Sequence, residues 1–361
     1  MAAAGAALAV LIPAASLMAD RPAGKGDGGP ARELRPALVS GRTVQVPVGL
    51  TEVASEEADR MTFVAAEDTE GGPPYRLWRL DLRSGSLIPG PVVAPVRDLR
   101  LHPEFEDTRL GFLAEDGALF SMAGFHAARP QQLAGGVGAF DFTGTRAPIA
   151  ARVHEALTPR EAGSRVRVEV GRAGGRRDRP GQSIEIRGLD LQGVRVSRTT
   201  AYLWGVRRGR GLVGVLGDGR LASRDLGRAR VVDVSPTGSA VVVAGGRSAS
   251  VVDPAGGRRT RLGLEIGSVA SWSPDGRWMV ATGSFADGVE GLWLVDARTG
   301  GLRQLDRSAG TDGPAGFSSG GRLVLWTEQK ALAALDLATR NAYRIELPPG
   351  FPEVVGPLVA G

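Results

Sequence analysis

A segment of about 40 residues that recurs along the chain constrains its fold more than any other feature. Asp253, Asp296 and Asp336 each end a strand-sized apolar run, and they lie 43 and 40 residues apart. Turn-forming residues follow each of them. A period of this size is that of one four-stranded blade of a β-propeller. The spacing therefore predicts an array of such blades.

The clearest copy of the repeat occupies residues 269–305 and divides into four strands. Residues 269–273 form the inner strand, and a Pro-Asp-Gly turn leads into the strand at 277–282. A longer loop precedes the strand at 292–296, and an Ala-Arg-Thr-Gly turn leads into the outer strand at 301–305. Apolar runs separated by such turns are hairpin signals. The tryptophans expected to pack between blades are Trp272, Trp293 and Trp326.

Weaker copies of the pattern cover most of the remaining chain, at residues 61–85, 98–121, 137–142, 201–219, 231–257 and 315–339. We therefore predict an all-β fold, a single β-propeller of about seven four-stranded blades. Six blades remain an alternative, because the register is poor between residues 150 and 200. The strand at 43–48 or the tail at 353–360 is expected to complete a blade shared by the two ends, since ring closure removes exposed sheet edges.

The inner strand of the clearest copy ends in Ser273-Pro-Asp-Gly-Arg277, and partial copies of this ending occur at 235–238 and 318–322. Together with the Asp-x-x-Ser/Thr-Gly turn that follows, the ending resembles the TolB-like and WD40-like (PD40) propeller repeats. The resemblance covers roughly residues 45–360. It implies a propeller protein of a bacterial envelope. It implies little about activity, because such repeats serve transport partners, peptidases and lyases alike.

The N-terminal residues 1–19 are nearly all apolar, and polar and turn-forming residues follow them. A run of this length suits a signal peptide or a short membrane anchor that forms a hydrophobic helix. Residues 20–41 have the composition of a flexible linker, and 42–361 are expected to form the propeller. These features predict an extracytoplasmic protein, anchored or secreted. The alternative is an anchored protein that faces the cytoplasm, because basic residues follow the run.

The residue types that carry most catalytic chemistry are scarce in this chain. It has no cysteine, which excludes disulfides, thiolate metal sites and a cysteine nucleophile. Its three histidines, His102, His126 and His154, are far apart in sequence, and we predict no metal site and no cofactor.

Two glycine motifs also fail as catalytic signatures. The G-x-S-x-G at 316–320 has no histidine after its serine, which a hydrolase triad of that type requires. The G-x-G-x-x-G at 209–214 precedes a strand rather than the helix of a dinucleotide site. We therefore predict no catalytic residue and expect that the chain is not an enzyme.

Binding on a propeller concentrates in its longer and more variable loops. The connection at 283–291 is one of these, and Phe285, Asp287 and Glu290 are predicted partner-binding residues. A basic hairpin loop adds a second predicted set, consisting of Arg176, Arg177 and Arg179. No aromatic residues interleave with these arginines, so specific nucleic-acid binding is not expected.

From these observations we predict a non-catalytic, monomeric β-propeller scaffold. It would bind a protein or peptide partner at the extracytoplasmic side of the membrane, which it contacts through its N-terminal segment. The alternative is a propeller enzyme of the lactonase or polysaccharide-lyase type, with its site at the mouth of the central channel.

Overall fold

A computed structural model describes residues 42–57, 60–66, 75–101, 109–125, 129–142, 148–156, 165–173, 182–197, 200–217, 220–245, 248–285, 288, 290–306, 314–328 and 330–360. The leader expected at 1–19 and the linker expected at 20–41 lie outside these residues. Among the described residues, no helix has the length and the apolar content needed to cross a bilayer.

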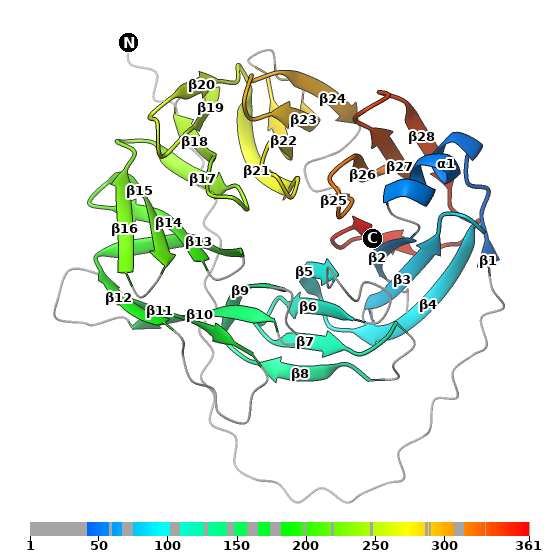
Figure 1. Cartoon of the computed structure of the whole chain (residues 1–361), viewed down its shortest axis with the longest axis horizontal. Coiled ribbons are helices and arrows are strands. Elements are labelled where there is room, and N and C mark those ends of the chain that lie inside the picture. Colours follow the sequence, from blue (N-terminus) through cyan, green and yellow to red (C-terminus); the bar gives the residue numbers. More distant parts are fainter. Residues whose placement is uncertain are drawn as a thin grey trace, which may run out of the picture. The chain divides into compact units, whose positions relative to one another are not determined.

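Seven antiparallel sheets follow one another around a ring, as Figure 1 shows. We number them as blades 1 to 7. Blade 1 contains β1 (Arg42–Thr43), β2 (Arg60–Ala66), β3 (Tyr75–Asp81), β4 (Ser86–Val93), β29 (Glu353–Val354) and β30 (Val359–Ala360). Blade 2 contains β5 (Val96–Leu101), β6 (Leu110–Ala114), β7 (Leu119–Met122) and β8 (Gln131–Ala134). Blade 3 contains β9 (Val137–Asp141), β10 (Ile149–Ala156), β11 (Arg165–Arg172) and β12 (Gln182–Arg187).

The remaining blades have four strands each. Blade 4 contains β13 (Leu189–Ser197), β14 (Thr200–Arg207), β15 (Arg210–Gly217) and β16 (Arg220–Asp225). Blade 5 contains β17 (Arg230–Val234), β18 (Val241–Gly245), β19 (Ser248–Val252) and β20 (Arg259–Arg261). Blade 6 contains β21 (Glu265–Trp272), β22 (Trp278–Ser284), β23 (Glu290–Asp296) and β24 (Leu302–Asp306). Blade 7 contains β25 (Ala315–Phe317), β26 (Leu323–Glu328), β27 (Ala331–Asp336) and β28 (Ala342–Glu346).

The predicted all-β propeller fold is confirmed, and the number of blades is seven rather than six. The middle strands of each blade are buried on both faces because each sheet packs against two neighbours. In β27, for example, all six residues are buried. The three repeat tryptophans are also buried, as expected, with 5%, 6% and 5% of the surface of Trp272, Trp293 and Trp326 exposed.

The serine of the Ser-Pro-x-Gly ending holds the turn between the two inner strands of a blade. The hydroxyl oxygen of Ser273 accepts the backbone N–H of Trp278 at 2.8 Å, and Gly276 closes the turn with a φ of 71°. Ser235 and Ser318 accept the backbone N–H five residues further on in the same way, each at 3.0 Å. Ser318 of the G-x-S-x-G motif is therefore buried within a turn of the repeat.

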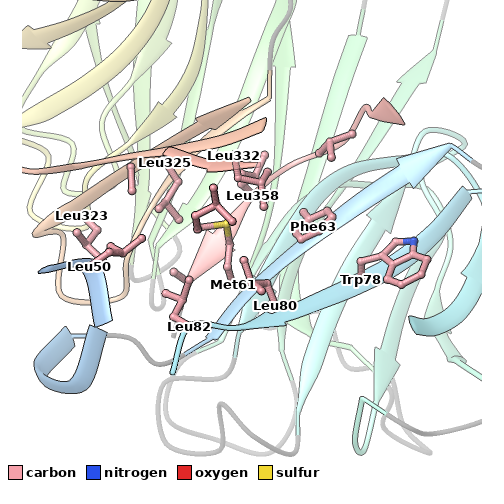
Figure 2. Close-up of a cluster of buried hydrophobic side chains, with 14 of the residues drawn as sticks. Leu50, Met61, Phe63, Trp78, Leu80, Leu82, Leu323, Leu325, Leu332 and Leu358 are labelled. Carbon is pink, nitrogen blue, oxygen red and sulfur yellow. The ribbon is translucent and has the colours of Figure 1, made fainter. Parts of the chain in front are cut away.

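The ring closes at blade 1, where both ends of the chain join one sheet. The C-terminal β29 and β30 pair with β2 on the channel side, whereas β1 pairs with β4 on the outer side. Leu358 packs beside β30 in a buried cluster with Met61 and Leu323, drawn in Figure 2. The tail thus supplies the inner strand of a blade whose other strands come from the N-terminal part.

The strand expected at 43–48 is shorter than predicted and is followed by a helix. Only Arg42–Thr43 are extended as β1, and α1 (Val48–Glu57) begins after Pro47. The carbonyl oxygen of Pro47 accepts the N–H groups of Leu50 and Thr51 at 2.9 and 3.0 Å, which starts the first helical turn. Leu50 and Val53 then face the buried cluster between blades 7 and 1. This burial favours the helix over a longer strand.

Candidate functional site

The inner strands of the blades enclose a cavity of about 480 Å³ in the centre of the ring. Its walls come from β5, β9, β13, β21, β25 and β30 and from the turns at which these strands end. All blades of a propeller converge on its central channel, so side chains from distant parts of the sequence meet there. This channel is the candidate functional site.

Four successive blades carry charged side chains on their inner strands, and four of these charges matter for the channel. They are Arg100 on β5, Asp141 on β9, Arg195 on β13 and Asp233 on β17. Blades 6 and 7 contribute neutral residues to the same cavity, including Ser271 and Ser319. The channel wall is therefore charged over blades 2 to 4 and neutral over blades 6 and 7, and Asp233 of blade 5 lies buried beside Arg195.

A chain of hydrogen bonds across three blades fixes the guanidinium of Arg195. Its Nη2 donates to both carboxylate oxygens of Asp233, at 2.9 and 3.2 Å. The indole Nε1 of Trp272, on β21, donates to the same carboxylate at 3.0 Å. Asp233 is nearly buried, so the ion pair is shielded from water and from salt. These hydrogen bonds hold Arg195 beside the channel in one orientation.

Arg100 lies among the carboxylates of three blades. Its Nε lies 3.2 Å from the nearer carboxylate oxygen of Asp98, which is on the same strand. The charge of Asp98 raises the pKa of Arg100, and the charges of Asp141 and Asp233 raise it further. Arg100 is therefore a permanent cation in the channel. Its side chain remains 38% exposed, so a ligand could reach it.

A second, smaller cavity of about 230 Å³ lies where the loops between successive blades meet the channel. Arg97 lines both cavities and donates to the carbonyl oxygen of Gly138 at 2.6 Å. Ser268 and Thr282, whose hydroxyls lie 2.8 Å apart, form another part of this wall. Val355, which is 40% exposed, adds an apolar surface. This mouth combines one cation, two hydroxyls and apolar side chains.

The channel has the groups needed to hold an anion with attached hydroxyls. Guanidinium groups bind carboxylates and phosphates through paired N–H donors, and aspartates accept from hydroxyl groups. Among the described residues, no three histidines or carboxylates lie close enough together to hold a metal ion. The arginines are therefore the groups here best suited to bind a negative charge.

Of the loop residues predicted to bind a partner, the structure describes Phe285 and Glu290, and neither lines this channel. Phe285 packs edge-on against Trp293, with ring centroids 4.7 Å apart, and Glu290 is exposed at the start of β23. Asp287 and the three arginines of the basic loop, Arg176, Arg177 and Arg179, lie outside the described residues. Their role in partner binding stays a prediction.

The sequence did not point to the charged residues of the channel, because they belong to no motif. The available signal was a charged residue inside an inner-strand sequence that is otherwise apolar. Asp233 within Val-Val-Asp-Val is one example, and Asp141 within Ala-Phe-Asp-Phe is another. A charge at such a position must face either the channel or a buried partner. The sequence does not show which charges of different blades lie at the same height in the channel.

No protein-family model matches the sequence, and no curated protein matches it significantly. Solved structures do match. An acylaminoacyl peptidase from Pyrococcus horikoshii is 11% identical with a TM-score of 0.53, over 77% of this chain and 50% of the peptidase chain. An oligogalacturonate lyase from Vibrio parahaemolyticus is 11% identical with a TM-score of 0.51, over 80% and 87% of the two chains. TolB from Acinetobacter baumannii is 12% identical with a TM-score of 0.37, over 91% and 88%.

The chain is thus a seven-bladed β-propeller, and at these identities the similarity establishes the fold alone. The expected resemblance to bacterial propeller-repeat proteins is confirmed at the level of the fold. The chain spans half the length of the peptidase it matches.

The expectation that the chain is not an enzyme is wrong. The solved structures similar to it include a peptidase and a lyase, so the propeller fold is shared with enzymes. That expectation rested on the absence of recognisable motifs. A site assembled from the inner strands of several blades leaves no motif in the sequence.

Proposed function

We propose that the chain is a propeller enzyme that binds a carboxylate-bearing sugar in its central channel and cleaves it by elimination. The observation that carries this proposal is that Arg100, Asp141 and Arg195 line one cavity, with Asp141 between the two arginines in blade order. Of the two enzyme types considered above, this is the polysaccharide-lyase type.

The elimination needs two kinds of group, and both occur in this wall. A cation against the carboxylate of a uronic acid makes the hydrogen on the neighbouring carbon C5 more acidic, and in this proposal Arg100 and Arg195 supply that cation. A base then removes that proton, the bond between C4 and the bridging oxygen breaks, and a C4–C5 double bond forms. The leaving oxygen takes a proton from water. Asp141 is the base in this scheme.

The scheme also assigns a role to the fixed orientation of Arg195. A guanidinium that already has its final position loses little conformational entropy when a carboxylate binds. Asp233 and Trp272 fix that position, because Arg195 donates to the carboxylate of Asp233 and Trp272 donates to the same carboxylate. They are positioning residues and do not touch the substrate in this proposal.

The test is an assay with polygalacturonate and other uronic-acid polymers, in which the ultraviolet absorbance of the unsaturated product is recorded. We expect product from the wild type and a loss of about 100-fold or more in Asp141→Asn, because a general base contributes a factor of this order. Asp275→Asn is the control, since Asp275 lies in the turn that follows β21 rather than on an inner strand.

Two results would contradict the proposal. One is the absence of unsaturated product from every uronic-acid polymer. The other is a rate that Asp141→Asn leaves unchanged. Hydrolysis of sugar lactones by the same preparation, with no unsaturated product, would assign the channel to lactonase chemistry instead.

A further inference from the structure

Five arginines gather at one end of blade 4, at the tip of a hairpin and in the connection that follows the outer strand. This blade 4 arginine cluster consists of Arg207, Arg208, Arg210, Arg228 and Arg230, all of which are exposed. Two carboxylates lie at the same end of the blade: Asp225, which is paired with Arg210, and Asp190, whose neighbour Leu189 lies opposite Arg207. The chain has 44 basic and 39 acidic residues, so its charges nearly balance overall, whereas arginines outnumber carboxylates in this cluster.

Backbone contacts show that the two halves of the cluster lie side by side. Arg208 and Gly209 form the hairpin turn between β14 and β15, with φ values of 52° and 72°. Gly211 donates its N–H to the carbonyl oxygen of Gly227 at 2.8 Å, and Leu226 donates to Gly211 at 2.8 Å. The hairpin tip is thus held against the segment that carries Arg228 and Arg230.

The cluster continues into the channel through a groove of about 510 Å³. Arg230, at the start of β17, is a member of the cluster and lines this groove. Arg195 and Asp233 line it as well, and Arg195 also lines the central cavity. A path of guanidinium groups therefore leads from the rim of blade 4 to the proposed catalytic residues.

We propose that the blade 4 arginine cluster binds the part of a linear polyanionic sugar chain that extends out of the channel. This inference rests on the proposed function and names its substrate as a polymer with a carboxylate on successive sugar units. One unit lies at Arg100 and Arg195, and the units beyond it follow the groove past Arg230 to the hairpin tip. Binding along such a path adds affinity for each unit that meets an arginine.

The surroundings of the cluster favour a sugar chain over other anionic partners. The large hydrophobic residues that are well exposed among the described residues, Val48, Val92 and Val355, belong to other parts of the propeller, so apolar insertion into a membrane finds no support here. The aromatic residues of blade 4 do not offer a stacking surface either. Trp204 is buried, and the ring of Tyr202 lies against Gly238 while its hydroxyl donates to the carbonyl oxygen of Thr237, so neither ring is open for stacking with a nucleic-acid base.

The test compares the binding of a long and a short probe, a fluorescent galacturonate dodecamer and galacturonate dimer, by anisotropy at low salt. In the double variant Arg208→Gln/Arg228→Gln we expect about tenfold weaker binding of the dodecamer, with a weaker salt dependence, because two charge contacts are lost. Dimer binding should stay unchanged. The control is Arg298→Gln/Arg340→Gln, which removes two exposed arginines from the turns between the outer strands of blades 6 and 7. Arg340, like Arg208, has a positive φ, at 64°.

Equal loss of dodecamer affinity in the two double variants would overturn the inference. Wild-type affinity of Arg208→Gln/Arg228→Gln for the dodecamer would overturn it as well. That conclusion would hold even if this variant had lost binding to phosphatidylglycerol vesicles or to DNA. The outcome is separable from that of the proposed function. A wild type that binds the dodecamer through the cluster but shows no dimer binding and no unsaturated product would refute the channel chemistry and leave the cluster assignment standing.

Discussion

Asp336, at the end of β27, shows how a single repeat residue stabilises its blade. Arg322 donates to its two carboxylate oxygens at 2.9 and 3.0 Å, and the N–H of Ala338 and the hydroxyl of Thr339 donate to it as well. The hydrogen bonds from Arg322 lower the pKa of Asp336 to about 2. Asp296 makes the same kind of pair with Arg277 at 3.3 Å. The arginine that ends the repeat motif therefore has a structural partner in the next hairpin.

This ion pair predicts a pH dependence of stability. The pKa of Asp336 is lower in the folded than in the unfolded chain, so its contribution is present above about pH 4 and is lost as the pH falls towards 2. Replacing it by Asn should lower the free energy of unfolding at neutral pH by about 2 kcal/mol. The difference from the wild type should shrink between pH 4 and pH 2, as measured by denaturant unfolding.

The matched control is Asp253→Asn, because Asp253 occupies the corresponding position in blade 5 and accepts the N–H of Ala255 at 2.8 Å. It is less buried than Asp336, and we expect a smaller change in its variant. An equal effect in both variants would show that the turn, rather than the buried ion pair, is what matters.

Closure of the ring stabilises the fold at the scale of elements. Leu358 is 2% exposed and packs with residues of blades 1 and 7, so it links the tail to both neighbours. The backbone also fits closely there, since a Cβ atom on Gly316 would clash with the carbonyl oxygen of Leu358. A weakened tail therefore loosens two blades at once.

We expect Leu358→Ala to lower the free energy of unfolding by about 3 kcal/mol, since it leaves a cavity in a packed core. Thermal and denaturant unfolding would measure the change. Val355→Ala changes the same tail at a residue that is 40% exposed, and it should cost less than about 1 kcal/mol. If the two variants lose the same stability, the tail is held by its strand pairing and not by this core.

The sequence predicted the fold well at this scale and the site poorly. The Ser-Pro-Asp-Gly turns and the aspartates that end the strands recur locally, so one blade could be read from a single segment such as 269–305. Helix α1 was not expected, because its formation depends on burial of Leu50 and Val53 against residues about 270 positions away. Tertiary burial of this kind leaves no periodic pattern in the sequence.

At the scale of the whole molecule, the arrangement of the blades creates a site that no single segment of the sequence contains. Arg100 and Arg195 are 95 residues apart and line the same cavity, and Asp141 lies between them on β9. Their neighbourhood follows from the order of blades around the ring. The proposed chemistry therefore depends on the closed propeller, and an opened ring should lose it before the individual blades unfold.

The most direct test of the account is a crystal structure of the protein with digalacturonate at saturating concentration. We predict electron density for the sugar in the central channel, with a carboxylate within hydrogen-bonding distance of Arg100 or Arg195 and C5 of that unit facing Asp141. Density confined to the hollow between blades 5 and 6, beside Arg258 and Arg277, would contradict the account, as would an empty channel.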